Sequence, residues 1–322
     1  MQPVLLPVHN RLTRRLFGLG AVDSLPIELT ARRVYILPSR TGLTFMALLA
    51  GMLLGSVNYA LSMGYLFTFL LLGLLASTLF ATWRNLIGIT LQSVESEPAF
   101  AGDTLSYSFR LAEAHGRARQ SIGVAIDGAT PAYMMIPASG SAHLVLQTPA
   151  RSRGRQPLGL VRIYTEYPLG LFHAWALLQP DITGMVWPRP TGPYPLPPPA
   201  GHEAGSGSAT RRGVEDFDSL RAYERGENPA RIAWKSLARH DEPLAKGFVT
   251  PLAVERWLAW DALGSLAPEA RLSQLARWVL EAERSGRPYG LRLPGQNLPP
   301  GAGVAHRNRC LNALALLQTE AV

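Results

Sequence analysis

The chain of 322 residues is 47% hydrophobic and only 17% charged, whereas about a quarter of an ordinary soluble protein is charged, so part of it must lie outside a soluble core. Its net charge of +8 comes almost wholly from arginines, which are spread along the chain and mixed with acids; this argues against a nucleic-acid-binding protein with one basic face. The single cysteine, Cys310, excludes an intrachain disulfide and a multi-thiolate metal site, and its apolar neighbours predict a buried structural thiol.

Residues 1–40 form a basic N-terminal segment, and residues 41–83 follow it without a charged residue or a histidine. A single helix of that length would be about 65 Å long, roughly twice the hydrocarbon core of a bilayer. The polar residues of SVNYALSMG (56–64) interrupt the apolar run. The pattern therefore predicts a transmembrane helical hairpin, with one helix from about Gly42 to Val57 and a second from about Met63 to Trp83.

Arginines flank this hairpin at both ends, and the turn between its helices has none. They are Arg11, Arg14, Arg15, Arg32, Arg33 and Arg40 on one side and Arg84 on the other. Because arginine and lysine are retained on the cytoplasmic side of a membrane, we expect a protein that spans the bilayer twice, with cytoplasmic N- and C-termini. The lipid bilayer is then its first expected partner.

After Arg84 the hydrophobic period becomes two, which is typical of β-strands. The alternating positions are Ile87, Ile89 and Leu91; Leu105, Tyr107, Phe109 and Leu111; Ile122, Val124 and Ile126; and Val161, Ile163 and Thr165. Glycine-containing turn signals separate these runs. Short strands at this spacing predict an antiparallel β-sandwich over residues 84–188, and its histidines are too far apart in sequence to indicate a catalytic site.

A Pro-, Gly- and Ser-rich stretch covers residues 189–210 and is interpreted as a linker. Residues 211–322 then change character. WLAW before Asp261 predicts a strand, Pro268 opens an amphipathic helix that Gly286 ends, PYGLRL predicts a second strand, and RNRCLNALALL predicts a second helix. This order favours an α/β domain with parallel strands, truncated relative to a complete doubly wound fold.

The chain has no nucleotide-binding loop, zinc-protease motif or serine-hydrolase elbow, so we expect neither an enzyme nor a bound cofactor. One place has partial metal-ligand chemistry: Asp261 and Ser265, at the carboxyl end of the first strand of the α/β domain. Mg²⁺ accepts a carboxylate, hydroxyls and waters, but Leu263 between the two supplies no ligand. The pair is an incomplete metal site, and an aspartate that caps a helix or orders a loop fits the same residues.

The stretch EDFDSLRAYERGENPARIAWKSLAR (215–239) is a dense mixture of arginines, acids and aromatics. Asn228 and Pro229 predict that a helix starts inside it. Its acids offset its arginines, which argues against a nucleic-acid contact. Two interpretations remain: an internal ion-pair network that fixes an irregular loop, or a docking surface anchored by Arg, Tyr and Trp.

The same stretch resembles the signature of a bacterial family known as domain of unknown function fifty-eight. The residues that carry the resemblance are Gly213, Phe217, Leu220, Arg221, Tyr223, Gly226, Arg231, Ile232, Trp234, Ala238 and Arg239. Glu227 stands where the family usually has Asp. The hairpin and the segment TEYPLGLFHAW (165–175) also fit family members, so the resemblance covers nearly the whole chain.

The resemblance implies assembly rather than catalysis. Family members are usually encoded beside MoxR-type AAA+ ATPases, von Willebrand factor A-domain proteins and transglutaminase-like membrane proteins, which become the expected partners. It also implies that residues 211–322 resemble a von Willebrand factor A domain, whose D-x-S-x-S metal-ion-dependent adhesion site has Leu263 at its middle position here. The expected function is an adaptor or assembly protein of the bacterial inner membrane, facing the cytoplasm, in envelope-protein maturation or stress. The alternative is a metal-dependent adhesion protein or enzyme that uses Asp261 and Ser265.

Overall fold

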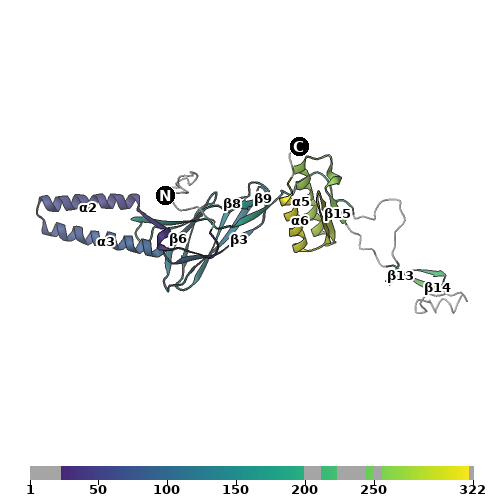
Figure 1. Cartoon of the computed structure of the whole chain (residues 1–322), viewed down its shortest axis with the longest axis horizontal. Helices are drawn as coiled ribbons and strands as arrows, with labels where there is room; N and C mark the ends of the chain where they lie inside the picture. The colour runs from purple at the N-terminus through teal and green to yellow at the C-terminus, as the bar shows by residue number, and fades with distance from the viewer. Residues whose placement is uncertain (1–22, 199–211, 223–243, 250–255, 319–322) are drawn as a thin grey trace. The chain divides into compact units, whose positions relative to one another are not determined.

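The computed structural model of the chain describes residues 23–198, 212–222, 244–249 and 256–318. The chain divides into two compact units, with the main boundary at Arg189 and Pro190; the short segment Ala315–Leu317 at the end of α6 is grouped with the first unit. The first unit contains the helices α2 and α3 and the strands β1 to β12, and the second contains α5, α6 and the strands from β13 onward (Figure 1). Each unit is described by itself.

Two antiparallel sheets form a β-sandwich in the first unit (Figure 1). One sheet has the strand order β1-β3-β5-β8, and the other has the order β2-β11-β10-β6-β7. Their bounds are β1 Ile27–Glu28, β2 Val34–Pro38, β3 Ile89–Glu97, β5 Thr104–Glu113, β6 Arg119–Ile126, β7 Ala132–Ile136, β8 Ser141–Pro149, β10 Val161–Thr165 and β11 Phe172–Leu178. A smaller sheet joins β4 (Ala99–Phe100), β12 (Thr183–Trp187) and β9 (Gly154–Pro157).

The core of the sandwich is built from the positions that alternate in the sequence. Leu105, Phe109 and Leu111 of β5 are fully buried, and Val124 of β6 and Ile163 of β10 meet them in the same apolar cluster. Burying side chains of this size is worth about 1.5–3 kcal/mol each, so the alternation supplies most of the driving force for the two sheets to pack. The prediction of antiparallel strands around one apolar core is confirmed.

The sandwich begins earlier in the chain than the sequence indicated. Strand β1 pairs with β3, with Ile27 opposite Leu91, and β2 pairs with β11, with Tyr35 opposite Trp175. Residues 27–38 therefore belong to the sheets, although we expected residues 1–40 to form a separate basic segment. Strands of two and five residues are too short to show a clear period, and partners far along the chain stabilise them.

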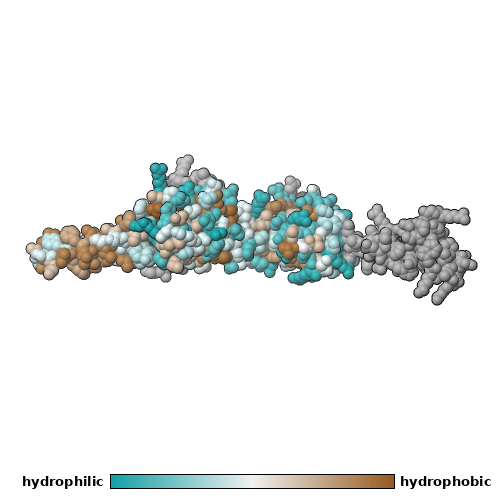
Figure 2. Space-filling view, turned by 90° about the horizontal axis from the view of Figure 1, so that it is seen from below, coloured by the Kyte–Doolittle hydropathy of each residue, from teal (hydrophilic) through white to brown (hydrophobic). Residues whose placement is uncertain are grey.

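The hairpin is an insertion between β2 and β3, and it projects from one end of the sandwich (Figure 1). Helix α2 spans Arg40–Asn58 and α3 spans Ser62–Leu86, so the chain breaks inside the predicted SVNYALSMG segment. Both helices are long and apolar enough to cross a membrane, and only 17% of each spanning window is buried by the rest of the protein. Figure 2 shows the hairpin as hydrophobic along most of its length. A core helix of a soluble protein would bury far more of this surface.

Small polar side chains are buried within the hairpin. Ser56 of α2 and Thr68, Thr78 and Thr82 of α3 are all at most 4% exposed. Each hydroxyl donates a hydrogen bond to the carbonyl four residues earlier in its own helix, so none is left unsatisfied. Small residues let two helices approach closely, and this leaves the leucines and phenylalanines to point outward.

The described core of the second unit is a strand–helix–strand unit. Strand β15 (Arg256–Ala259) leads through a 3₁₀ turn (Asp261–Leu263) into α5 (Pro268–Arg284), and β16 (Tyr289–Leu293) returns parallel to β15. Strand β17 (Gln296–Gly301) then pairs antiparallel with β16, and α6 (Val304–Leu316) follows. The predicted order of elements and the parallel pair are confirmed, and Gly286 follows α5 with the positive φ of a residue past a helix C-terminus.

The sequence did not predict β17. Its residues, QNLPPG, include two prolines, which cannot donate hydrogen bonds in the middle of a sheet. In the structure β17 lies at the edge of the described three-stranded sheet, where prolines are tolerated. The strand order of the described residues does not by itself identify this unit as a von Willebrand factor A-like domain.

The beginning of the predicted linker is packed against α5. Gln274 is fully buried, and its amide oxygen and nitrogen lie 2.9 Å from the backbone nitrogen and carbonyl oxygen of Tyr194. The Trp278 indole donates to the same carbonyl at 3.2 Å, and Arg277 donates to the carbonyl of Gly192. Residues 190–194 thus form a strap over α5 instead of a free spacer, because one amide side chain satisfies both backbone groups of Tyr194.

Substituting Gln274 with Leu is expected to release this strap. A buried donor that loses its partner costs about 1–3 kcal/mol, and the Tyr194 amide loses its partner entirely. Hydrogen exchange at Tyr194 in the full-length protein should then accelerate by roughly tenfold or more. The matched control is Gln296→Leu, whose side chain is exposed. Equal protection of Tyr194 in both variants would contradict this account.

Candidate functional site

Residues in the turn that contains Asp261 and Ser265 already make packing and hydrogen-bond contacts within the protein. Leu263, at the middle position, is 1% exposed and belongs to the core of the unit. The Ser265 hydroxyl lies 3.2 Å from the Tyr194 hydroxyl. Asp261 is exposed. Among the described residues, no three His, Cys, Asp or Glu side chains are grouped so that they would hold a metal ion.

Arg271 also holds this turn in place. Its guanidinium donates to the carbonyls of Leu266 and Gly264, both at 2.7 Å, and stacks over the Trp260 ring at 5.3 Å. The two backbone oxygens that flank Ser265 therefore already have a cation. This arrangement supports the second sequence interpretation, an aspartate in an ordered turn, more than a metal ligand.

The signature residues fall partly on a strand of an antiparallel pair. Strand β13 (Arg212–Ala222) pairs antiparallel with β14 (Leu244–Val249), and the register places Phe217 opposite Phe248 and Arg221 opposite Ala245. Of the two interpretations, the irregular loop is replaced by a strand with register shifts over residues 212–222, which include Gly213 and Leu220. The helix predicted at Asn228 and the remaining signature residues lie outside the described residues: Tyr223, Gly226, Arg231, Ile232, Trp234, Ala238 and Arg239.

Cys310 is the buried structural thiol that the sequence predicts. It is fully buried, and burial raises its pKa to about 12, the opposite of what a nucleophile requires. Its sulfur lies 3.5 Å from Nε2 of His306, one turn earlier on α6. That nitrogen also lies 2.8 Å from the Tyr289 carbonyl, which can only accept, so Nε2 carries its proton and cannot take one from the thiol. The pair fixes α6 on β16.

A buried ion pair ties the end of α3 to the sandwich. The Glu113 carboxylate is fully buried and lies 2.8 Å from the guanidinium of Arg119, which is 4% exposed. It also accepts the backbone N–H groups of His115, Arg117 and Ser139 at 3.0–3.2 Å. Burial tends to raise the pKa of Glu113, but the hydrogen bonds from Arg119 and from the backbone, together with the Arg119 charge, hold it below its ordinary value.

Arg119 and Asn85 connect this ion pair to the helix. Arg119 donates to the carbonyl of Arg84 in the last turn of α3, where cations favour the helix dipole. Asn85 bonds both backbone groups of Gln120, at 2.8 and 3.2 Å, and donates to the Thr165 hydroxyl at 3.0 Å. The hairpin is therefore joined to β6 and β10 by hydrogen bonds from Arg119 and Asn85.

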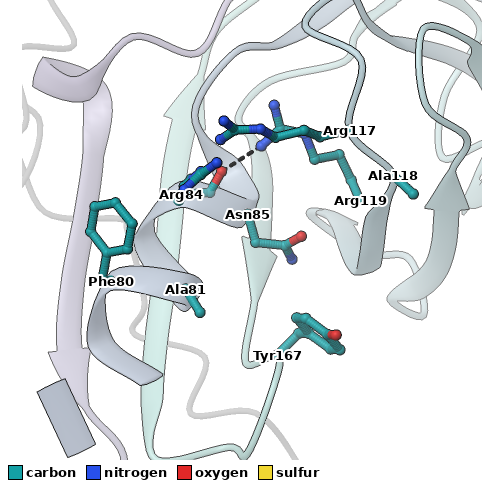
Figure 3. A pocket seen from close by; sticks show the side chains of 8 residues that line it. All are labelled: Phe80, Ala81, Arg84, Asn85, Arg117, Ala118, Arg119 and Tyr167. Atoms are coloured by element: carbon teal, nitrogen blue, oxygen red, sulfur yellow. Dashed lines mark hydrogen bonds between the residues drawn. The ribbon is translucent and has the colours of Figure 1, made fainter. Parts of the chain in front are cut away.

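A pocket of about 410 Å³ opens beside this junction. It is lined by Phe80, Arg84, Asn85, Arg117, Arg119 and Tyr167, with two alanines. Figure 3 shows the guanidinium groups of Arg84, Arg117 and Arg119 near one another, with the Phe80 ring on the side of Arg84 and the Tyr167 ring below them. The Arg84 guanidinium lies over the Phe80 ring at 5.5 Å. The pocket thus brings cationic and aromatic side chains together at the base of the hairpin; we call it the juxtamembrane pocket.

The outer face of the five-stranded sheet carries a continuous row of rings, which we call the aromatic row. Its members in strand order are Tyr35 (β2), Trp175 and His173 (β11), Tyr164 (β10) and Tyr133 (β7). Successive ring centroids lie 5.4–6.0 Å apart. Strand β6 lies between β10 and β7, and at this level of the sheet it has Gly123, which has no side chain. The Tyr164 ring fills the space over Gly123, and its hydroxyl lies 3.0 Å from that of Tyr133.

Neither feature follows from the sequence. Of the pocket arginines, only Arg84 stands out there, as a charge that flanks the hairpin, and nothing singles out Arg117, Arg119 or Glu113. The single signal for the aromatic row was the outward half of the strand alternation, where Tyr35, Tyr164 and Trp175 occupy positions that are polar in an ordinary exposed sheet face. Their neighbourhood depends on strand register between segments more than one hundred residues apart, which no local pattern reveals.

Comparisons of the chain with models of known protein families and with curated proteins find no match. The site is therefore interpreted from its own geometry.

Proposed function

We propose that the protein is a non-enzymatic adaptor or assembly protein anchored in the bacterial inner membrane by its hairpin. The observation that carries the proposal is the pair α2 and α3, whose apolar surface is largely unburied and whose ends are built into a folded sandwich. Exposed apolar surface of this extent is stable in lipid and not in water. The hairpin then holds the sandwich at a membrane surface.

The charge distribution supports a cytoplasmic sandwich. Arg40 begins α2 and Arg84 lies in the last turn of α3, and the three-residue turn Tyr59–Leu61 at the far end has no charged residue. The positive-inside rule then places both helix ends that join the sandwich in the cytoplasm.

The docking face of this proposal is the accessible edge of the aromatic row at Tyr133, which packs on the buried Tyr164. Tyr and Trp are the side chains that most often anchor protein interfaces, because they bury large areas with little loss of conformational entropy. Tyr133 and its neighbour Met135 are 57% and 56% exposed, so the edge of the row is accessible. By the family resemblance, the partner is a MoxR-type AAA+ ATPase, with von Willebrand factor A-domain or transglutaminase-like membrane proteins in the same assembly. The C-terminal unit is proposed to be a von Willebrand factor A-like domain without its metal.

The test is binding of the detergent-purified protein to a purified MoxR-type ATPase. Tyr133→Ala is expected to weaken binding by roughly thirtyfold, the effect of losing an interface anchor worth about 2 kcal/mol. The control is Val145→Ala, which removes an equally exposed side chain, 55%, from β8 of the other sheet. Failure of the unmodified protein to bind the ATPase would remove the partner from the proposal, and equal effects of the two substitutions would remove the docking face.

A metal-dependent adhesion protein or enzyme is the weaker candidate. Leu263 lies in the core, the Ser265 hydroxyl bonds Tyr194, and Arg271 occupies the carbonyls on both sides of Ser265. No contact of these residues favours a cation over the ordered turn.

A further inference from the structure

The juxtamembrane pocket has more positive charges than nearby carboxylates neutralise. Arg119 is committed to Glu113 and to the Arg84 carbonyl. Arg84 and Arg117 are exposed, and among the described residues no carboxylate lies within ion-pair distance of either side chain. Three arginines thus face one carboxylate, which leaves a surplus of two positive charges.

A second observation points to a ligand in the same place. The Nε atom of Arg119 is buried and has no hydrogen-bond partner within the described part of the chain, although Arg119 lines the pocket. A buried donor without a partner is uncommon and costs about 1–3 kcal/mol, so such a group is often completed by a bound molecule. An oxyanion fits this donor better than a neutral group, because the guanidinium is charged.

The position of the pocket selects the kind of oxyanion. Phe80 and Arg84 are one turn apart near the end of α3, and Phe80 is 53% exposed, with the Arg84 guanidinium 5.5 Å from its ring. Tyr167 and Leu169, in the loop that meets the hairpin, are 42% and 53% exposed. An arginine beside aromatic side chains at the end of an apolar helix is the arrangement found at the boundary between headgroups and acyl chains.

We propose that the juxtamembrane pocket binds the phosphate of an anionic phospholipid headgroup. Arg84 and Arg117 hold the phosphate oxygens, Arg119 adds its positive charge beside them, and Phe80 and Tyr167 contact the glycerol and the first methylene groups. The site makes the junction between hairpin and sandwich sensitive to the lipid composition of the membrane. This inference rests on the proposed membrane anchoring.

Native mass spectrometry of the full-length protein in detergent tests the proposal, with phosphatidylglycerol and phosphatidylcholine of the same acyl chains as probes. The protein should bind phosphatidylglycerol at least roughly tenfold more tightly, since basic residues at a membrane surface contribute about 1 kcal/mol each with anionic lipid. The double variant Arg84→Gln/Arg117→Gln should lose roughly ten- to a hundredfold of that affinity. The matched control, Arg110→Gln/Arg155→Gln, makes the same charge change at two exposed arginines of β5 and β9 and should bind as the unmodified protein does.

Equal binding of the two lipids, or equal loss in both double variants, would overturn the proposal. If sn-glycerol 3-phosphate displaced bound phosphatidylglycerol as effectively as free phosphatidylglycerol does, the ligand of the pocket would be a soluble phosphate ester and not a lipid. Carbonate extraction of membranes that contain the same proteins tests the membrane anchoring independently of lipid binding to the pocket. An unmodified protein that is released by carbonate would contradict the anchoring, whereas membrane-retained protein without lipid preference contradicts the pocket alone.

Discussion

Replacing Glu113 with Ala is expected to destabilise the sandwich by about 3–5 kcal/mol, because it leaves the buried Arg119 guanidinium without its counter-ion. The three backbone N–H groups that the carboxylate accepts lose their partner at the same time. Hydrogen exchange of β5 and β6, measured by mass spectrometry on the detergent-solubilised protein, should accelerate by roughly a hundredfold or more.

Two variants separate the ion pair from a general effect of losing an acid. Glu97→Ala removes an exposed carboxylate from β3 and should change exchange in the sandwich very little. The double variant Glu113→Leu/Arg119→Met replaces both charges with apolar groups of similar size and should recover the part of the loss that comes from the uncompensated Arg119 charge, but not the part from the three N–H groups. If Glu113→Ala behaved like Glu97→Ala, the ion pair would have no role in joining the hairpin to the sandwich.

The pH dependence of the same site has a defined sign. Since the folded protein holds the pKa of Glu113 below the ordinary value of 4.5, the carboxylate contributes stability that is fully present above that value. This contribution is lost as the pH falls through the lower, folded pKa. The stability difference between the unmodified protein and Glu113→Gln should therefore shrink as the pH is lowered below 4.5. A difference that is constant with pH would show that the carboxylate charge contributes nothing.

Substituting Gly42 with Ala is expected to separate α2 from the sandwich. Gly42 lies in the first turn of α2, and a Cβ atom there would collide with the carbonyl oxygen of Leu171, a backbone atom that cannot rotate away. Ser39 holds this contact in place, since its hydroxyl accepts the Gly42 N–H at 3.0 Å and its own N–H donates to the Leu171 carbonyl at 2.9 Å. Overpacking of this kind typically costs about 1–3 kcal/mol, and a collision with backbone lies at the upper end.

The control for this substitution lies in the same helix. Gly51→Ala adds the same methyl group where nothing lies within 4 Å, and alanine is about 1 kcal/mol better than glycine inside a helix. The two substitutions should therefore change stability in opposite directions. Protease cleavage between the hairpin and the sandwich should become faster for Gly42→Ala only, and equal cleavage of the two variants would show that the contact with Leu171 does not hold the hairpin.

Much of the fold was predictable because it depends on short-range patterns. The absence of charge over residues 41–83 predicts apolar spanning helices, and the interruption at 56–64 predicts where they separate. The period of two predicts the sandwich strands, and Pro268 and Gly286 mark the ends of α5 within one or two residues. Each of these signals acts within a few residues of the element that it specifies.

The candidate sites were less predictable. The sequence points to Asp261 and to the signature stretch 215–239, but hydrogen-bonded residues surround the first, and the second is described only at β13. The partners that make the juxtamembrane pocket come from α3, from the segment before β6 and from the loop after β10. An arginine that closes a helix and one that precedes a strand give no sign in the sequence that they meet.

What the sequence by itself determined is the set of local elements: an apolar hairpin flanked by arginines, alternating strands, and a strand–helix–strand unit with a buried Cys310. Only the tertiary structure decided that residues 27–38, which precede the hairpin, add one strand to each sheet of the sandwich. It also decided that Gln274 holds residues 190–194 on α5. It also decided that Glu113 and Arg119 form a buried pair and that Tyr35, Trp175, Tyr164 and Tyr133 form one row. The physical reason is that local propensity acts over a few residues, whereas register, burial and ion pairing depend on strands brought together from distant parts of the chain.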